Sequence, residues 1–275
     1  MNRVMALVSV CAGTVVGLGT PAIGAFDTLY GCEYPGFTDL STFDQSTGAI
    51  SSVGPSGWSG LADMTSDTRE GSFRMWSVQS SSNTLVTFDP VTGVATAGPT
   101  LDAPDQIVSL AFDVVSGKLY GNSCVGFGAP FDALYEIDPD TGASTFIGRI
   151  LFENVYALGF DQDGKLFGIA DASDDLISIS TASGNGTLVA ELDQLSAFDM
   201  ASRPSDGTMF VAQSDNPGFL STIDTTTGVI TPIGAYDPAA LRNVVGLAFG
   251  PVPTPGAATA LVLAGMGMSR RRSRR

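Results

Sequence analysis

Hydrophobic and polar residues alternate along most of the chain in short runs that end at Gly, Pro, Asp or Ser. In one representative stretch, apolar runs at 108–112, 118–121, 133–137 and 143–147 are separated by such turn residues. Short alternating runs of this kind predict β-strands, and residues 26–250 lack the 3.6-residue periodicity of helices. The pattern therefore predicts a unit of four short strands.

This unit recurs about every 45 residues, and a turn motif of the form D-x-x-T-G marks each copy. The motif begins at Asp44, Asp89, Asp138, Ser180 and Asp224, and the fourth copy has Ser in place of both Asp and Thr. The Asp carboxylate accepts backbone N–H bonds, and the Gly supplies the positive φ of a hairpin. Four strands per unit of this length are typical of a β-propeller blade.

The ends of the repeat region predict how the ring closes. It starts at 26–31 with the second strand of a unit and ends at 245–249 with a first strand. Together the two pieces complete one blade, so we expect an all-β, five-bladed β-propeller of four-stranded blades over residues 26–250. Pairing of 245–249 with 29–31 would leave no open sheet edge at the seam.

Charge is distributed unevenly along the chain. There are 28 acidic and 13 basic residues and no histidine, and six of the basic residues lie in the first 25 or last 25 positions. Residues 26–250 therefore carry a net charge of −21. Such a surface repels nucleic acid and anionic lipid, and the composition excludes any chemistry that needs histidine.

The N-terminus predicts export. Arg3 precedes an apolar run from Val4 to Gly19, and small side chains stand before Ala25. This is typical of a secretory signal peptide over residues 1–24, with cleavage after Gly24 or Ala25. The alternative is an N-terminal membrane anchor. Export machinery is thus an expected partner.

The C-terminus, residues 251–275, has a Pro-rich linker, a short apolar segment and an arginine cluster. It resembles the sorting tails of the PEP-CTERM family, with the motif at Val252, Pro253, Pro255 and Gly256, although Thr254 stands where the family usually has Glu. The resemblance implies sorting machinery as a partner, transient membrane association through the tail, and a location in the cell envelope, at the cell surface or outside the cell. The arginines would stay on the cytoplasmic side. A nucleic-acid tail is the alternative interpretation of this cluster.

Aspartates that recur at one place in the unit are interpreted as structural residues. This applies to the turn motif and to a second set that we place after the first strand in four of the units: Asp63, Asp113, Asp161 and Asp199. Residues that break the repeat are better ligand candidates. We expect three of them, Glu33, Asn122 and Arg242, at the mouth of the central channel. A fourth candidate, Phe127, lies in the loop 121–131, which could offer its aromatic ring to a ligand.

Metal chemistry is limited to hard ions because the chain has no His and three Cys. Asp171, Asp174 and Asp175 form a possible Ca²⁺ site, and no other cofactor is expected. The run 161–164 begins like an EF-hand loop, but Ala172 occupies the place of the bidentate Glu, so a hairpin turn is the better interpretation. Cys32 and Cys124 could pair in a disulfide, but their blades are not neighbours, so the sequence does not decide whether they do.

The sequence shows no nucleophile paired with histidine and no phosphate-binding glycine loop. We therefore expect a non-catalytic binding or scaffold module with an extracellular glycan or protein ligand. The alternative is a glycoside hydrolase with two carboxylates in the channel, 5 to 9.5 Å apart as a rough range.

Overall fold

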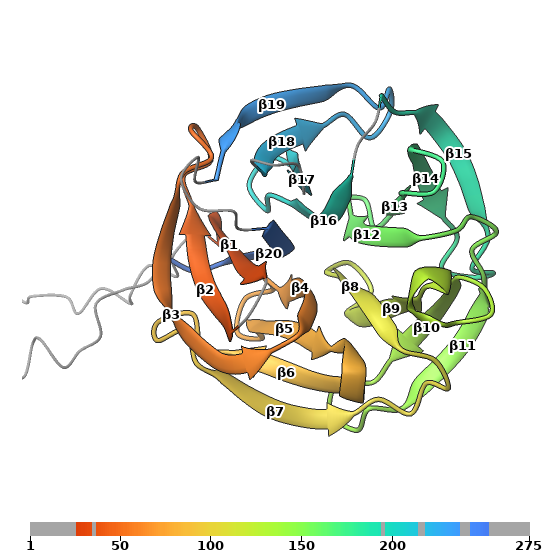
Figure 1. Ribbon diagram of the computed structural model, residues 1–275, viewed down its shortest axis with the longest axis horizontal. Coiled ribbons are helices and arrows are strands. Elements are labelled where there is room, and N and C mark those ends of the chain that lie inside the picture. The colour runs from red at the N-terminus through yellow and green to blue at the C-terminus, as the bar shows by residue number, and fades with distance from the viewer. Residues whose placement is uncertain (1–25, 35–36, 194–195, 214–217, 237–242, 253–275) are drawn as a thin grey trace, which may run out of the picture.

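The computed structural model describes residues 26–34, 37–193, 196–213, 218–236 and 243–252. These residues form five four-stranded antiparallel sheets arranged as a ring (Figure 1). The fold is therefore the five-bladed β-propeller predicted by the repeat. No helix in the described ranges is long and apolar enough to cross a membrane.

Each blade has its first strand at the centre of the ring and its fourth strand at the outside. The inner strands are β4 (Leu61–Asp67), β8 (Ile107–Asp113), β12 (Val155–Phe160), β16 (Ala197–Ser202) and β20 (Asn243–Gly250). The second strands are β1 (Thr28–Tyr34), β5 (Arg74–Gln79), β9 (Lys118–Ser123), β13 (Leu166–Ala170) and β17 (Met209–Gln213). The third strands are β2 (Phe37–Phe43), β6 (Thr84–Phe88), β10 (Ala133–Ile137), β14 (Asp175–Ile179) and β18 (Phe219–Ile223). The outer strands are β3 (Ile50–Ser59), β7 (Ala95–Thr100), β11 (Ser144–Arg149), β15 (Gly186–Glu191) and β19 (Ile230–Ala235). Two short 3₁₀ helices, η1 (Ser80–Ser82) and η2 (Val125–Phe127), lie between second and third strands.

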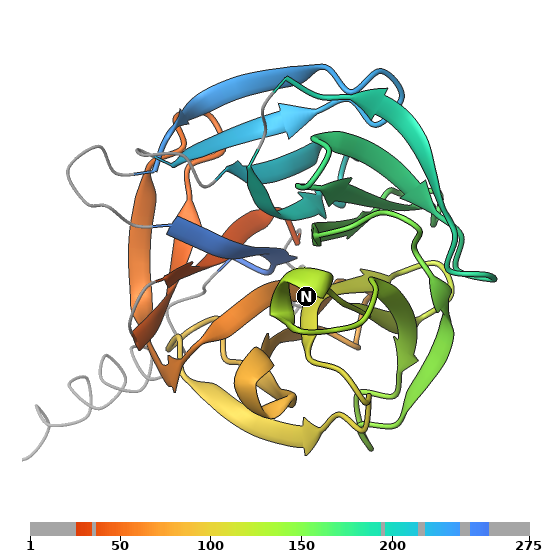
Figure 2. The same cartoon turned by 45° about the vertical axis from the view of Figure 1, so that its right-hand side comes forward.

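The ring closes as the split unit predicted. β20 pairs antiparallel with β1, with Leu29 opposite Phe249 and Gly31 opposite Leu247 (Figure 2). The last strand of the chain thus becomes the inner strand of the blade that the first strand begins. This pairing leaves no open edge at the seam.

The D-x-x-T-G motifs form the turns between third and fourth strands. In the first copy, the Asp44 carboxylate accepts N–H bonds from Ser46 and Thr47, and Gly48 has φ of +77°. A Cβ on Gly48 would lie 2.4 Å from the carbonyl oxygen of Gly234 on the neighbouring blade. Glycine is therefore required both for its backbone conformation and for blade packing.

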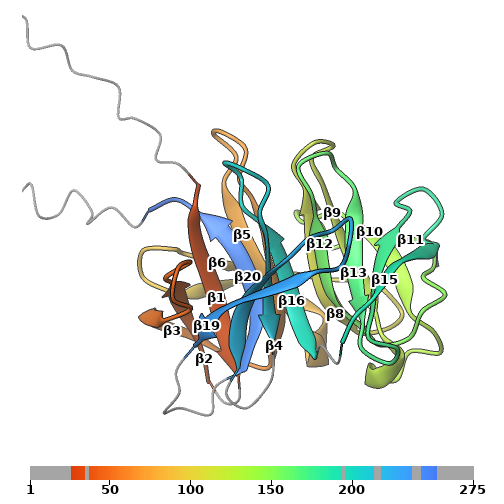
Figure 3. The same cartoon turned by 90° about the horizontal axis from the view of Figure 1, so that it is seen from above.

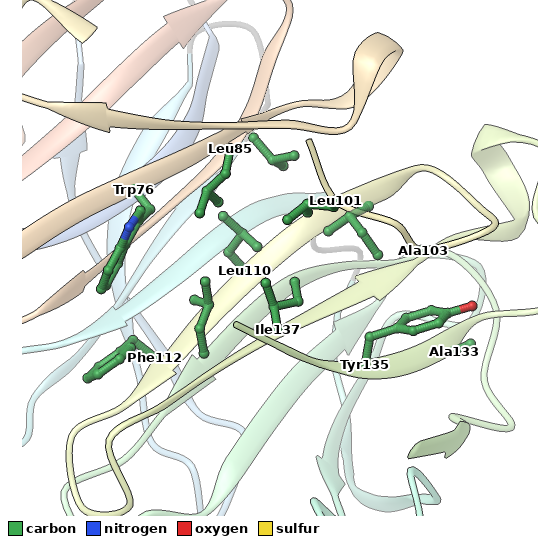
Figure 4. Packing of buried hydrophobic residues seen from close by; sticks show 12 residues of the cluster. Trp76, Leu85, Leu101, Ala103, Leu110, Phe112, Ala133, Tyr135 and Ile137 are labelled. Atoms are coloured by element: carbon green, nitrogen blue, oxygen red, sulfur yellow. The ribbon is translucent and has the colours of Figure 1, made fainter. Parts of the chain in front are cut away.

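Apolar side chains fill the spaces between neighbouring blades. Between the blades of β4 and β8, Trp76, Phe112, Leu110 and Tyr135 are buried in one cluster (Figure 4). The ring centroids of Trp76 and Phe112 are 5.4 Å apart. Similar clusters join the other blades, so each blade is stabilised by its two neighbours.

The inner strands all run in the same direction, which gives the channel two distinct ends (Figure 3). We name the end at which they finish the turn end, because the D-x-x-T-G turns lie there. The other end holds the loops between second and third strands and the connections between blades. We name it the bulge end, for the irregularity described next.

Candidate functional site

Every inner strand has a β-bulge at the same place. The pairing register with the second strand shifts by one residue between Ile107 and Ser109, and equivalent shifts occur in β4, β12, β16 and β20. A bulge leaves one residue unpaired and redirects its side chain. The residues at this position, which we name the bulge ring, are Ala62, Val108, Tyr156, Phe198 and Val245.

The bulge ring lines a cavity of about 460 Å³ at the bulge end. Tyr156 and Phe198 contribute aromatic rings, while Ala62, Val108 and Val245 contribute small or aliphatic side chains. All five blades therefore contribute to one pocket. Its remaining lining comes from loops and strand starts: Gly60, Leu61, Ser80, Phe127, Asp171 and Ser196.

The loop after β9 places Phe127 at the edge of this cavity. Phe127 is 46% exposed, and its ring meets that of Tyr156 edge-to-face at a centroid distance of 6.0 Å. Buried Asp132 fixes the loop, because its carboxylate accepts the N–H of Val125 at 2.7 Å and that of Val155 at 2.7 Å. The Tyr156 hydroxyl lies over Gly126, where a Cβ would approach it to 2.3 Å. This aromatic edge is thus positioned by the fold.

Asp171 is the one acidic residue among the described residues that line the cavity. It follows β13, and its N–H donates to the carbonyl of Asn154 at 3.0 Å. Burial raises the pKa of the Asp171 carboxyl, and a hydrogen bond with Ser196 offsets part of the rise. Burial, with nearby Cys124, Asp171 and Asp132, also raises the pKa of Tyr156 to about 12. The cavity therefore presents a phenol that stays neutral beside a carboxylate.

The position after the bulge ring closes the centre of the channel. We name its residues the plug: Asp63, Ser109, Ala157, Asp199 and Gly246. Asp63 and Asp199 are fully buried and hydrogen-bond to each other. A Cβ on Gly246 would lie 2.7 Å from the backbone nitrogen of Met64, so the inner strands approach closely here.

Polar residues of the plug also join neighbouring blades. The carboxylate of Asp63 accepts the N–H of Leu110 at 2.7 Å, and that of Asp199 accepts the N–H of Leu247. The Ser109 hydroxyl donates to the carbonyl of Tyr156. Each contact reaches the inner strand of the next blade, so the plug stabilises the ring.

The two plug carboxyls have strongly perturbed acidities. Burial, then the charge of Asp199, raises the pKa of Asp63 well above its ordinary value. Burial raises the pKa of Asp199 to about 7. Two carboxyls in contact without water do not both ionise readily, so we infer that the pair shares one proton at neutral pH.

The sequence-based prediction that Asp63 and Asp199 follow the first strand of their units is wrong. They lie inside β4 and β16, whereas Asp113 ends β8 and Asp161 begins the turn after β12. The true counterpart of Asp113 in β4 is Asp67. The run 161–164 does form the predicted hairpin turn, with Gly164 at φ of +76°.

Two of the predicted ligand residues lie away from the cavity. Glu33 is buried and accepts a hydrogen bond from Ser41 at 2.6 Å. Asn122 is buried, and its amide donates to the carbonyl of Val155 at 2.8 Å. Phe127 does line the cavity, and Arg242 lies outside the described residues. Ligand binding by any of the four stays a prediction.

The structure does not gather the three aspartates proposed for Ca²⁺. Asp171 faces the cavity, Asp174 is in a left-handed turn conformation, and Asp175 is buried within the β13–β14 pairing. Among the described residues, no three acidic, Cys or His side chains form a group able to hold a metal ion. The spacing of the three aspartates along the turn separates their side chains.

Cys32 and Cys124 are free and buried. Cys32 lies in β1 and Cys124 follows β9, on blades that are not neighbours. Burial raises the pKa of both thiols, that of Cys124 to about 11. Neither side chain is a thiolate at neutral pH.

Sequence reasoning missed Tyr156 and Phe198, although a signal was present. Aligned on the Leu or Met that follows the plug, the inner strands read A-D-M, V-S-L, Y-A-L, F-D-M and V-G-L. The first letter is always apolar but varies widely in size. Aligning Leu61 with Leu110, as the shared Leu-Ala pair suggests, shifts one strand and hides this column.

A second, smaller cavity of about 280 Å³ lies at the turn end. Its lining includes Thr65, Gly159, Ala201 and Ala248 from the inner strands, and Asp161 is its one acidic residue. Larger inner-strand side chains also line it: Phe112, Phe160, Met200, Leu247 and Phe249. The bulge-end cavity is larger, and each of its five inner strands directs one side chain into it from a bulge. The bulge-end cavity is therefore the better candidate site.

Comparisons with known proteins give the fold alone. No family model and no curated protein matches this chain. A chain from the crystal structure of a nidogen/laminin complex aligns with a TM-score of 0.54 and 9% identity, covering 84% of this chain and 83% of that chain. A structural genomics protein of unknown function from Bacteroides thetaiotaomicron VPI-5482 aligns with a TM-score of 0.52 and 15% identity, covering 68% of this chain and 54% of that chain. Similarity at these identities supports the propeller architecture and leaves the ligand open.

Proposed function

We propose that this protein is an exported, non-catalytic binding or scaffold module whose ligand site is the bulge-end cavity. The observation that carries the proposal is the bulge ring, because five separate strands each direct one side chain into the same pocket. Bulges are frequent next to functional sites, where they redirect side chains. A concave, mostly apolar pocket with few polar groups is typical of ligand sites.

The arrangement of carboxylates favours binding over glycoside hydrolysis. Hydrolysis of this kind needs two carboxylates on either side of a substrate. Among the described residues, each of the two cavities has a single acidic residue in its lining, Asp171 or Asp161. The carboxyls that do converge, Asp63 and Asp199, are fully buried and bonded to each other, which leaves no room for a sugar.

A thermal-shift screen of the exported protein against glycans and peptides tests this function. Each hit is then measured on Phe198→Ala, which opens the cavity wall, and on Phe146→Ala as a control. Phe146 is 52% exposed on the outer strand β11, away from the cavity. We expect the ligand-induced shift to disappear in the first variant and to persist in the second, without turnover of the ligand.

Turnover that one carboxylate substitution abolishes would favour the hydrolase instead. Ligand binding that is unchanged by Phe198→Ala would show that the ligand binds at another site. Export is tested separately by intact mass of the protein in the envelope or extracellular fraction. Full-length chain found only in the cytosol would refute export and the role of the tail.

A further inference from the structure

The walls of the bulge-end cavity are unusually aromatic for so small a pocket. Phe127, Tyr156 and Phe198 come from three successive blades, and all three are partly exposed. Aromatic faces are electron-rich and attract cations as well as apolar groups. The pocket thus offers flat apolar surface with a negative electrostatic character.

The charged side chains in the described loops of the bulge end are all acidic. The described loops of the bulge end contain no Lys or Arg. Apart from Asp102, which bonds to the D-x-x-T-G turn of the next blade, they contain six acidic residues: Asp105, Asp132, Glu153, Asp171, Asp174 and Asp193. The nearest described base on a strand is Arg149, whose guanidinium already lies 3.7 Å from the centre of the Phe131 ring. An approaching cation therefore meets complementary charge from these loops.

Elsewhere in the protein, arginine side chains form cation–π contacts with aromatic rings. Arg69, Arg74 and Arg203 lie over Phe112, Trp76 and Phe210 at 4.9 to 5.4 Å from the ring centres. In the described structure, the rings of the cavity have no such intramolecular cation. The rings of Phe127, Tyr156 and Phe198 thus lie in one cavity with the Asp171 carboxylate, and no described cation of the protein lies over them. A ligand could supply that cation.

We propose that the cavity takes the guanidinium group of an arginine side chain on a partner polypeptide. The guanidinium would stack on the Tyr156 and Phe198 rings and pair with the Asp171 carboxylate. Arginine fits better than lysine because its planar group is more weakly hydrated and stacks on aromatic rings. This inference rests on the proposed binding function and names the ligand class of that same site.

Isothermal titration calorimetry of the exported protein tests the inference with two probes. One is acetyl-Gly-Arg-Gly-amide, and the other is its citrulline analogue, which has nearly the same shape without the charge. We expect the citrulline peptide to bind at least about tenfold more weakly, because it loses the ion pair and the cation–π attraction. Raising the salt concentration should weaken only the arginine peptide.

Two substitutions that remove the same charge distinguish direct contact with the ligand from long-range electrostatic attraction. Asp171→Asn removes the carboxylate inside the cavity, while Asp193→Asn removes an exposed carboxylate at the same end that does not line it. We expect about a tenfold loss of affinity for the first and less than about twofold for the second. Phe198→Leu should weaken the arginine peptide about three- to tenfold by removing one ring.

Each contrary outcome has a distinct meaning. Equal binding of both peptides, equal effects of the two aspartate substitutions, or no binding of the arginine peptide would overturn the arginine ligand. The binding function itself would survive if a ligand of other chemistry lost affinity in Phe198→Leu. It would fail if every ligand found were insensitive to the cavity variants.

Discussion

The plug and the bulge ring occupy neighbouring positions on the same five strands, yet they differ in burial and in what their side chains contact. Plug residues are buried, and the polar ones hydrogen-bond to the next blade or to each other. In the bulge ring, Tyr156 and Phe198 are partly exposed, and their rings face a cavity. One position joins the blades, and the preceding one supplies the side chains that line the cavity.

The largest expected effect comes from removing one plug carboxyl. Asp199→Ala would leave the N–H groups of Met200 and Leu247 without their acceptor and would strip Asp63 of its partner. We expect the free energy of unfolding to fall by about 3 to 5 kcal/mol. Denaturant titration with an unchanged m-value would measure this loss. A loss below about 1 kcal/mol would show that the pair contributes little.

The same pair should impose an unusual dependence of stability on pH. The folded-state pKa of Asp199 is raised to about 7 from an unfolded value near 4, so the native state keeps a proton that the unfolded chain has lost. Stability from this pair is therefore complete below about pH 4 and decreases as the pH rises towards 7, by about 2 to 4 kcal/mol. Buried Cys32, whose raised pKa partly reflects the charge of Asp199, stays protonated throughout this range.

Turn aspartates act in the opposite direction at lower pH. Hydrogen bonds from turn backbone and side-chain groups lower the pKa of Asp44, Asp89, Asp138 and Asp224, so their contribution is lost on acidification below about pH 4. Unfolding at a series of pH values should show a maximum near pH 4 to 5. Asp63→Asn should flatten the decrease between pH 4 and 7, and an unaltered slope would contradict the shared proton.

A smaller loss is expected where the fold positions the edge of the cavity. Asp132→Ala removes the acceptor for Val125 and Val155, so we expect a loss of about 1 to 3 kcal/mol. Hydrogen exchange should become faster at residues 125–129 in particular. Exchange that increases uniformly over the blade would mean that Asp132 does not fix this loop.

The smallest stability effect should come from the bulge ring itself. Phe198→Leu keeps most of the apolar volume at a partly exposed position, so we expect a change below about 1 kcal/mol together with a clear loss of ligand affinity. Thermal unfolding and calorimetry on the same sample would measure both quantities. A large stability loss would contradict the division of roles between plug and bulge ring.

The fold was predictable from the sequence because its determinants are local and repeated. Asp44 and Gly48 specify a hairpin within five residues, and recurrence of such turns reveals the blade length. The split unit at the two ends then fixed the closure by β20. The pairing of Asp63 with Asp199 was not predictable, because they are 136 residues apart and meet only at the centre of the closed ring.

The cavity was only partly predictable. Phe127 was recognisable as a residue that breaks the repeat, whereas Tyr156 and Phe198 look like ordinary strand residues. Their role depends on a bulge, and a one-residue change of register reverses which side chains face the channel. Glu33 and Asn122 also break the repeat, but Glu33 accepts a hydrogen bond within its own blade and Asn122 donates one to the neighbouring blade.

The most direct test is a crystal of the protein soaked with acetyl-Gly-Arg-Gly-amide at a concentration that saturates binding in solution. Our account predicts density for the guanidinium in the bulge-end cavity, against the rings of Tyr156 and Phe198 and within hydrogen-bonding distance of the Asp171 carboxylate. Density for the peptide at the turn end or on the outer strands, with the bulge-end cavity empty, would contradict it.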